Sequence, residues 1–565
     1  MVDLRSTLPI GKPMVAEFVR TLSAAGYMPL VIVLYGSLTL FRLGVPDLAS
    51  DEGRFGLSAI NLLTDYRQFA LVSQAPQGGP GTLPYAYPLA LAASLMTLGK
   101  SEFALRFVNV VALFAGAVMF SRAVRLLGKE VRLGQLVFAV FLLNPATITY
   151  ARYALPEAFV VACGCAALLA AAKASTRGSV AWGALCGLAL ATTFLVKLWL
   201  VVPFVLACGA IFLVARPTTA SVTLRGAAGA ALLVFATGSA SHLFLVVLLA
   251  PNFLGHWLDV YYGFAFKSRL AGAGYDPVLW YRPWWFYLAA LFKASFWGLP
   301  FVLLGAWYIV KARDMALVLL VAALLSPVLL LSVFRVKQAS YIYASVLAVS
   351  ILLAVGLPAF LQKRTLTAVL VASGLAAAAA ALCFASGVIT SAELLLIGGL
   401  YGVYLICALV TPFYGRWARF TAMTALAGVL LYAGIAVVQK TLLHRTYFRE
   451  IAGYFAPAVA STKPTDVVFT SPEAPAMEFY TYRRGVYWRT FRYQQGNDEF
   501  IRELECPSKL FYVVDQHGWI YGGEISPEKL ATLKTYAAEV TLAIEHSARL
   551  ALPVSVFVPK GQKCK

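Results

Sequence analysis

Charged side chains are scarce in this sequence, and acidic ones are the scarcest. Only 13% of the 565 residues are charged, with 26 Asp and Glu against 46 Lys and Arg, whereas soluble globular domains carry about 25% charged residues. Hydrophobic residues make up 60% of the chain, and its mean hydropathy is +0.77. This composition excludes a cytosolic enzyme, a DNA-binding protein and a disordered regulator, and it predicts an integral membrane protein.

Metal-binding patterns of cysteine and histidine are also missing. The chain has eight Cys and five His, and no CxxC or Cys/His metal spacing occurs among them. Only Cys506 and Cys564 lie in the polar tail. In an oxidising compartment we expect these two to pair, which would stabilise the tail by about 4 kcal/mol. The alternative is that Cys564, one residue from the terminus, stays free.

Apolar runs long enough to cross a bilayer recur between Tyr27 and Val438. A helix needs about 20 residues to span the hydrocarbon core, and the pattern predicts thirteen spans. They cover residues 27–41, 103–121, 133–150, 156–172, 180–196, 198–215, 226–250, 284–310, 315–334, 339–360, 365–388, 393–412 and 419–438. The run at 83–98 is short and contains Pro84 and Pro88, so we predict a helix lying at the membrane surface. The first twenty residues lack the pattern of a cleaved signal peptide, which predicts that the first span stays as an anchor.

Lys and Arg gather in the loops on one side of this predicted bundle. Residues 1–439 carry 30 Lys and Arg against 13 Asp and Glu, and residues 440–565 carry 16 against 13. The positive-inside rule therefore places the amino terminus in the cytoplasm and, after an odd number of crossings, the tail outside. The excess charge orients the bundle and indicates no nucleic-acid partner. Function should concentrate in the two long outer loops, 42–102 and 251–283.

The polar tail has a different pattern from the rest of the chain. Strand-like runs alternate there with helical stretches, which predicts a small α/β domain. The strand-like runs are DVVFTS, LFYVVDQ and PVSVFVP, and the helical stretches lie near 472–481, 496–505 and 526–536. We therefore expect a membrane catalytic domain over residues 1–439, with surface helices in its first outer loop, and a periplasmic α/β domain over residues 440–565.

Two adjacent acids, Asp51 and Glu52, follow the first predicted span in the segment LASDEGRF. In one interpretation Ser50 caps a helix whose first turn carries both acids, which the helix dipole favours. In the other, a carboxylate at the membrane surface acts as general base or metal ligand, and Arg54 holds it or binds an anion. The spacing alone leaves both interpretations open.

A set of cations breaks the positive-inside pattern on the predicted outer side. They are Arg152, Lys197, Lys267, Arg269, Arg282, Arg335 and Lys337. Snorkelling to lipid headgroups accounts for any one of them, but together they favour a site for phosphate or diphosphate. The aromatic cluster at 280–287 is either an interfacial belt or a surface on which a sugar ring stacks. Lys293 lies inside a predicted span, where a charge requires a cavity or an acid.

Seven segments, spread in order over some 300 residues, carry a resemblance to a known family. They are DEGRF (51–55), QAPQGGPGTLPYAYP (74–88), LGKSEFALRFVNV (98–110), NPATITYARYALPEAFV (144–160), GLALATTFLVK (187–197), FKSRLAGAGYDPVLWYRPWWFYLAAL (266–291) and FRVKQASYIYASV (334–346). This ordered set resembles the GT-C superfamily of polyprenyl-phosphate-dependent glycosyltransferases. The branch is the one that contains protein O-mannosyltransferases and the lipid A aminoarabinose transferase. No single segment is specific, but their order is.

The resemblance implies a GT-C-like enzyme of the bacterial inner membrane whose active site faces the periplasm. It would transfer a sugar from a polyprenyl-phosphate donor to a glycolipid such as lipid A, a polysaccharide or a protein, with inversion at the anomeric carbon. Asp51 would be the general base, supported by Glu52. The donor phosphate would be bound by Lys337, Arg269, Lys267, Arg335 and Arg54, and the acceptor or sugar by Glu157, Arg152, Tyr85, Tyr341 and Arg282. Membrane lipids are implied partners, no cofactor is assigned, and a divalent metal ion is left open.

Two positions depart from the family's pattern. Where the aminoarabinose transferase branch has an acidic-basic-proline triplet, this chain has QGGP (77–80), and where relatives often have Asp it has Glu157. A second function class stays in view, a transporter or flippase for lipid-linked glycans, which would need ionised residues along the spans near the middle of the membrane. The predicted spans are mostly free of charge, which favours the transferase. We also expect a hydrophobic groove beside the active site to hold the isoprenoid tail.

Overall fold

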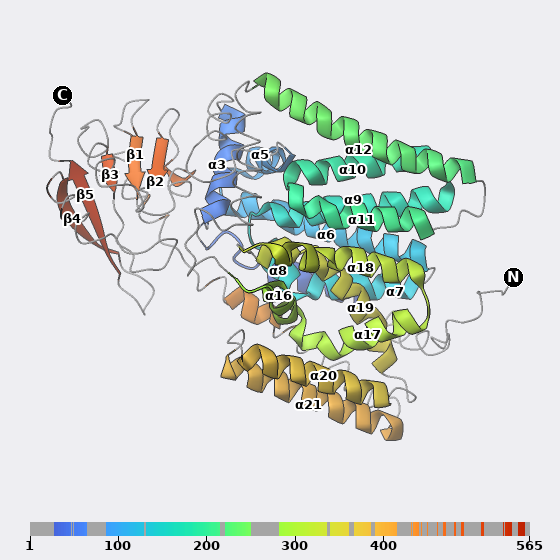
Figure 1. The fold of residues 1–565 in the computed structure, drawn as a ribbon. Helices are drawn as coiled ribbons and strands as arrows, with labels where there is room; N and C mark the ends of the chain where they lie inside the picture. The colour runs from blue at the N-terminus through green and yellow to red at the C-terminus, as the bar shows by residue number, and fades with distance from the viewer. Residues whose placement is uncertain are drawn as a thin grey trace. The chain divides into compact units, whose positions relative to one another are not determined.

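Helices account for most of the described residues in the computed structural model shown in Figure 1. The structure describes residues 27–46, 48, 50–64, 86–128, 131–214, 221–249, 282–335, 339–360, 366–385, 390–414, 431, 433–439, 442, 449, 452, 460, 467–470, 479–481, 487–490, 510–512, 531, 535, 537–544 and 552–559. The chain divides into two compact units. One comprises residues 1–43, 84–87 and 106–443, and the other comprises residues 44–83, 88–105 and 444–565.

Most of the helices belong to the first unit. They are α2 (Tyr27–Leu40), α6 (Glu102–Gly128, most of its length), α7 (Val131–Leu143), α8 (Pro145–Ala151), α9 (Pro156–Arg177), α10 (Val180–Val196), α11 (Leu198–Val214), α12 (Ser221–Leu249), α16 (Phe286–Ser295), α17 (Leu299–Lys311), α18 (Met315–Leu330), α19 (Ser345–Phe360), α20 (Leu366–Ala385) and α21 (Ser391–Tyr414). Short 3-10 turns, η3 (Phe296–Gly298), η4 (Leu331–Val333) and η5 (Ala339–Ile342), adjoin α16, α18 and α19. Helices α9 to α12 lie alongside one another, and α20 with α21 forms a hairpin beside α17 (Figure 1).

Local sequence signals set several of these helix boundaries. Asn144 caps α8, because its side chain accepts a hydrogen bond from the N–H of Ala146 at 2.8 Å. Helix α9 starts with Pro156 in its first turn and ends at Gly178, whose φ of 63° is the left-handed conformation that glycine adopts without strain. The Asp314 side chain caps α18 by accepting from the N–H of Leu317 at 3.2 Å.

Helices occur in the first twelve of the thirteen predicted spans, and residues 419–438 lie mostly outside the described part of the chain. Three described helices, α6, α9 and α18 with η4, are long and apolar enough to cross a membrane. The count rises to five if two bent pairs each form one span: α7 with α8, bent by 59°, and α16 with α17, bent by 105°. The total number of crossings stays a prediction.

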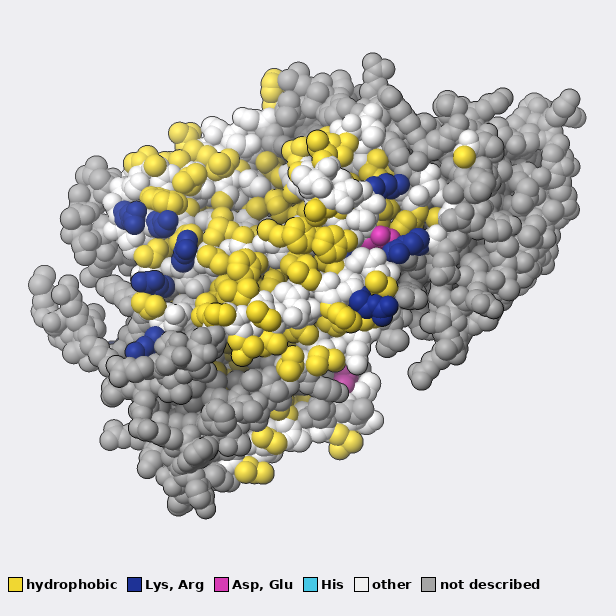
Figure 2. Space-filling model, turned by 180° about the vertical axis from the view of Figure 1, so that it is seen from behind, with side chains coloured by type: hydrophobic (Ala, Val, Ile, Leu, Met, Phe, Trp, Pro, Cys, Tyr) yellow, Lys and Arg dark blue, Asp and Glu magenta, His cyan; other side chains and the backbone are white. Residues whose placement is uncertain are grey.

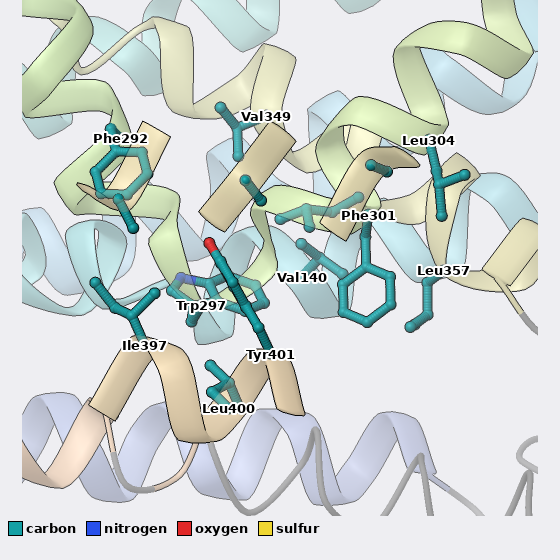
Figure 3. Close-up of a cluster of buried hydrophobic side chains, with 14 residues drawn as sticks. Val140, Phe292, Trp297, Phe301, Leu304, Val349, Leu357, Ile397, Leu400 and Tyr401 are labelled. Carbon is teal, nitrogen blue, oxygen red and sulfur yellow. The ribbon is translucent and has the colours of Figure 1, made fainter. Parts of the chain in front are cut away.

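A cluster of large apolar side chains forms one part of the core of the first unit (Figure 3). Trp297 and Phe301, both 2% exposed, lie among side chains from α7, α19, α20 and α21. The cluster also includes Val140, Phe292, Leu304, Val349, Leu357, Ile397, Leu400 and Tyr401. It joins the α20–α21 hairpin to the rest of the bundle through the 3-10 turn η3 and helix α17.

Helices α17 and α19 approach each other closely at two glycines. A Cβ added to Gly356 would lie 1.8 Å from the carbonyl oxygen of Phe301, and one added to Gly305 would lie 2.0 Å from that of Leu352. No side chain fits at these contacts unless the two helices move apart.

Gly356→Ala should therefore destabilise the protein by about 1–3 kcal/mol, the usual range for overpacking a core. Gly374→Ala, on α20, is the matched control, because a Cβ there meets nothing within 4 Å. That substitution should be neutral or stabilising by up to about 1 kcal/mol, since alanine is the better helix former. Thermal unfolding in detergent measures both, and equal melting temperatures for the two variants would contradict the close approach.

Apolar side chains cover much of the surface of the described helices. Figure 2 shows one face of the molecule, where hydrophobic side chains spread over the helices and Lys and Arg stand in separate groups. On the hairpin, Leu382 and Leu395 are 71% and 77% exposed. Large exposed apolar surfaces mark interaction sites, membranes among them.

The second unit combines the first predicted outer loop with the tail, which the sequence analysis assigned to different domains. It contains α3 (Ser50–Thr64), nearly all of α5 (Ala86–Leu98), and five strands: β1 (Val467–Thr470), β2 (Tyr487–Thr490), β3 (Leu510–Tyr512), β4 (Ala537–Ile544) and β5 (Leu552–Pro559). Strands β2, β1 and β3 form a parallel sheet in that order, and β4 pairs with β5 in the antiparallel direction.

Three of these strands, β1, β3 and β5, lie in the predicted strand-like runs. Helix α5 occupies the run at 83–98, as predicted. Its place at the membrane surface, the α/β domain as a whole and the boundary at residue 440 stay predictions. Cys506 and Cys564 lie outside the described residues.

Candidate active site

Several helix ends of the first unit meet around a buried carboxylate. Glu157 lies in the first turn of α9, where Leu155 and Pro156 start the helix. Its Oε1 accepts a hydrogen bond from the Lys197 ammonium at 2.5 Å, and the Glu157 side chain is only 4% exposed. Lys197 occupies the break between α10 and α11, in an extended conformation that ends α10. The sequence placed both residues on the outer side, but it gave no sign that they pair.

The ammonium of Lys197 also lies over an aromatic ring. Its Nζ is 4.9 Å from the ring centroid of Tyr341, which is buried in the 3-10 turn before α19, and this distance is within the range of a cation–π contact. Nearby in the sequence, Tyr343 contacts Tyr150 of α8, with the ring centroids 4.1 Å apart and the rings tilted by 35°. The segment FRVKQASYIY thus contributes two aromatic rings to this end of the bundle. Lys337, from the same segment, lies outside the described residues.

In the ion pair of Lys197 and Glu157, the ammonium is partly exposed to solvent and one carboxylate oxygen has no hydrogen-bond partner among the described residues. The Lys197 side chain is 22% exposed, and Glu157 Oε2 is buried without a hydrogen-bond partner among the described residues. A buried carboxylate oxygen without a donor is costly, which makes this position suited to accept a hydroxyl or a water. The arrangement can therefore present a cation and an acceptor oxygen to one polar ligand.

Two exposed arginines lie close together at the same end of the unit. The N–H of Arg282, before α16, donates to the carbonyl oxygen of Arg335, after η4, at 3.1 Å. Both side chains are exposed. The structure thus brings together Arg282 and Arg335, two of the predicted ligand-binding residues. Lys267, Arg269 and Tyr85 lie outside the described residues.

Arg152 has a structural role that the sequence analysis did not foresee. We predicted that it contacts the acceptor or sugar, but it is 1% exposed. One terminal nitrogen, Nη1, donates to the carbonyl oxygens of Leu38, Thr39 and Phe41 at 2.9–3.1 Å, where α2 ends. The guanidinium thus satisfies carbonyl groups that a helix terminus leaves without donors.

The charge of Arg152 persists despite its burial. Burial, followed by repulsion from Arg106, lowers the pKa of its guanidinium to about 10, which keeps it protonated at neutral pH. Arg106 on α6 is likewise 1% exposed, and its Nη1 donates to the carbonyl oxygen of Leu43 at 2.9 Å. The amide of Asn109 completes this framework by donating to the carbonyl oxygens of Tyr153 and Leu155 at 2.6 and 2.7 Å.

Arg152→Ala should lower the free energy of unfolding by about 3 kcal/mol or more, because it removes charged hydrogen bonds and leaves buried carbonyls without donors. Arg177→Ala is the control, since Arg177 is exposed at the end of α9 and surface substitutions usually stay within about 0.5 kcal/mol. Thermal unfolding in detergent compares them. Equal melting temperatures would contradict the structural role of Arg152.

The predicted base lies in the second unit. Helix α3 begins at Ser50, so Asp51 and Glu52 occupy its first turn, as one interpretation of the sequence required. Glu52 is fully buried and Arg54 is half-buried, whereas the side chain of Asp51 lies outside the described part. Among the described residues, no group of three His, Cys, Asp or Glu side chains gathers to hold a metal ion.

Lys293 lies inside an apolar run, where a charge requires a partner, and it forms an ion pair with an acidic residue. Its ammonium lies 3.0 Å from a carboxylate oxygen of Glu393, in the first turn of α21. Because this pair joins α16 to the hairpin, it gives Lys293 a structural role.

The comparisons with known proteins agree with the resemblance drawn from the sequence. No family model and no curated protein matches the chain. Among solved structures, ArnT from Cupriavidus metallidurans bound to undecaprenyl phosphate matches with a TM-score of 0.63 at 15% identity, over 94% of this chain and 98% of that one. The chain has the fold of ArnT. The apo state of the same protein matches with a TM-score of 0.60 at 15% identity, over 95% of this chain and 98% of that one.

The likeness to ArnT agrees, in the fold alone, with the resemblance that the sequence predicts. The sequence analysis counted Lys197 among the cations of a phosphate site but gave it no partner, and it left Asn109 and Arg106 out of the candidate site. A signal existed for each, since Lys197 was among the outer cations and the other two are polar residues within an apolar run. Their partners could not be inferred, because they come from distant parts of the chain.

Proposed function

We propose that this chain is an integral membrane glycosyltransferase that uses a polyprenyl-phosphate-linked sugar as donor. The observation that carries the proposal is that the chain has the ArnT fold over nearly its whole length. The ArnT structure that it matches is bound to undecaprenyl phosphate. We place the protein in the bacterial inner membrane, with its amino terminus in the cytoplasm and its active site and tail in the periplasm. The acceptor is a glycolipid, a polysaccharide or a protein.

In the proposed mechanism, Asp51 takes the proton of an acceptor hydroxyl as its oxygen attacks the anomeric carbon of the donor. A new carbon–oxygen bond forms, and the bond from the anomeric carbon to the phosphate oxygen breaks. The polyprenyl phosphate leaves with the bonding electrons, and the configuration inverts. Glu52 supports Asp51, and the phosphate is stabilised by Lys337, Arg269, Lys267, Arg335 and Arg54.

The paired residues Lys197 and Glu157 of the first unit are proposed to bind polar groups of the donor. Lys197 contacts the polar part of the donor. Glu157 holds the Lys197 ammonium in place through Oε1, and its other carboxylate oxygen, Oε2, accepts a hydroxyl of the sugar. Tyr341, Tyr85 and Arg282 line the sugar or acceptor. Arg152 no longer belongs among the contacts, because its guanidinium is buried against the end of α2.

The experiment that tests this function uses the full chain purified in detergent with a radiolabelled polyprenyl-phosphate sugar and extracted envelope glycolipids. We expect release of polyprenyl phosphate and transfer of label to one acceptor fraction. If the lipid-linked sugar stays intact in detergent but crosses the bilayer of proteoliposomes, the protein is a flippase and the transferase proposal fails.

A further inference from the structure

Tail residues of the second unit hold the segment that carries Asp51. The N–H of Leu48, three residues before Asp51, donates to the hydroxyl oxygen of Tyr480 at 2.8 Å. Leu48 is fully buried, so this amide has no water as an alternative acceptor. A residue more than 400 positions away in the sequence thus fixes the chain just before α3.

A second tail residue packs against the same helix on the other side of Asp51. Phe479 is 2% exposed, and a Cβ added to Gly56 would lie 2.9 Å from its ring carbon Cδ2. Gly56 therefore leaves room for the ring of Phe479 against α3. Lys100, whose Nζ is 5.1 Å from the centroid of this ring, covers another part of it.

A third tail residue fixes the start of the same loop. Arg449 donates through Nη2 to the carbonyl oxygen of Gly44 at 3.1 Å and pairs with the carboxylate of Glu102 in the first turn of α6. Its guanidinium lies 6.0 Å from the ring centroid of Tyr480. The three tail residues are therefore linked, and we name Arg449, Phe479 and Tyr480 the tail clamp.

We infer that the tail clamp positions Asp51 for the reaction, so that these three tail residues are required for full catalytic activity. Its three anchor points, Gly44, Leu48 and Gly56, lie on both sides of Asp51 in the sequence. The part of this inference that concerns catalysis rests on the proposed function, in which Asp51 is the general base. None of the three is proposed to touch substrate, so they are positioning residues.

The physical reason is the geometric demand of general-base catalysis. A base acts only within hydrogen-bonding reach of the proton it removes, and misplacement by about 1 Å can lower a rate by about 100-fold. The first turn of a helix frays readily when no other part of the chain holds it. Fixing the residues before and after Asp51 limits this fraying.

Two mild variants test the inference. Tyr480→Phe removes only the hydroxyl that accepts from Leu48, and Phe479→Leu keeps an apolar side chain but removes the ring. Amide hydrogen exchange of the peptide covering residues 44–64, measured without donor, should become about fivefold faster in Tyr480→Phe, as loss of one typical hydrogen bond predicts. A similar increase is expected in Phe479→Leu, because the smaller side chain leaves space against α3. In the transferase assay kcat should fall by about 10- to 100-fold, while KM for the donor stays within about twofold of wild type.

Thr535→Val and Phe384→Leu are the matched controls, because they remove an exposed tail hydroxyl and a ring on α20 that is 43% exposed. In both control variants, the amide exchange rates of residues 44–64 and the kcat should equal those of the wild type. Unchanged exchange of residues 44–64 in both clamp variants would overturn the inference, as would faster exchange with unchanged kcat. A wild-type protein that consumes no donor would refute the proposed function separately, since the exchange measurement needs no turnover.

Discussion

Asp51→Asn should lower kcat by about 10²- to 10⁴-fold, the usual contribution of a general base. The asparagine keeps the size and polarity of the side chain but cannot accept the proton of the acceptor hydroxyl. Binding of the donor should change little, because cations elsewhere in the chain are proposed to hold its phosphate. Turnover of a polyprenyl-phosphate sugar, followed as released polyprenyl phosphate, measures the effect, and donor affinity is measured on the same samples.

The matched control is Asp314→Asn. Asp314 caps α18 through the N–H of Leu317, and asparagine caps a helix as well as aspartate does, so turnover should stay at the wild-type level. Glu52→Gln distinguishes the two adjacent acids. If Asp51→Asn turns over like wild type and Glu52→Gln does not, the base is Glu52 and our assignment is wrong.

Lys197→Met should be the most destabilising single substitution at the candidate site. It leaves Glu157 as a buried carboxylate without its partner, and breaking a buried ion pair from one side costs about 3–5 kcal/mol. The double variant Glu157→Gln/Lys197→Met removes both charges, and it should recover most of that stability. Donor binding should stay weak in the double variant, because the cation that we propose to contact the donor is missing.

Thermal unfolding and donor affinity are measured on the wild type, both single variants and the double variant. Together these four proteins form a double-mutant cycle. Stability and donor affinity that recover together would show that the pair acts only in folding, and would remove Lys197 from the proposed site. A Lys197→Met protein as stable as wild type would contradict the buried pair itself.

The sequence by itself determined where the helices lie. The run 180–196 contains no charged residue, and a chain in lipid must satisfy its backbone hydrogen bonds within each segment. The span predicted at 156–172 begins where α9 begins but stops short of its end at Arg177, and the single span predicted at 133–150 is two helices bent by 59° at Asn144. The ordered segments from DEGRF to FRVKQASYIYASV also pointed to the fold that the ArnT structures share.

Only the tertiary structure decided what the polar residues do. Arg152 and Lys197 are both outer cations in the sequence, yet one is buried against the end of α2 and the other pairs with Glu157 beside Tyr341. Likewise, nothing near Tyr480 indicates that its hydroxyl accepts from Leu48. The length of an apolar run can be read from that run alone, without knowing the rest of the chain. The role of a charge depends on which distant residues fold beside it, because its desolvation must be compensated by specific partners.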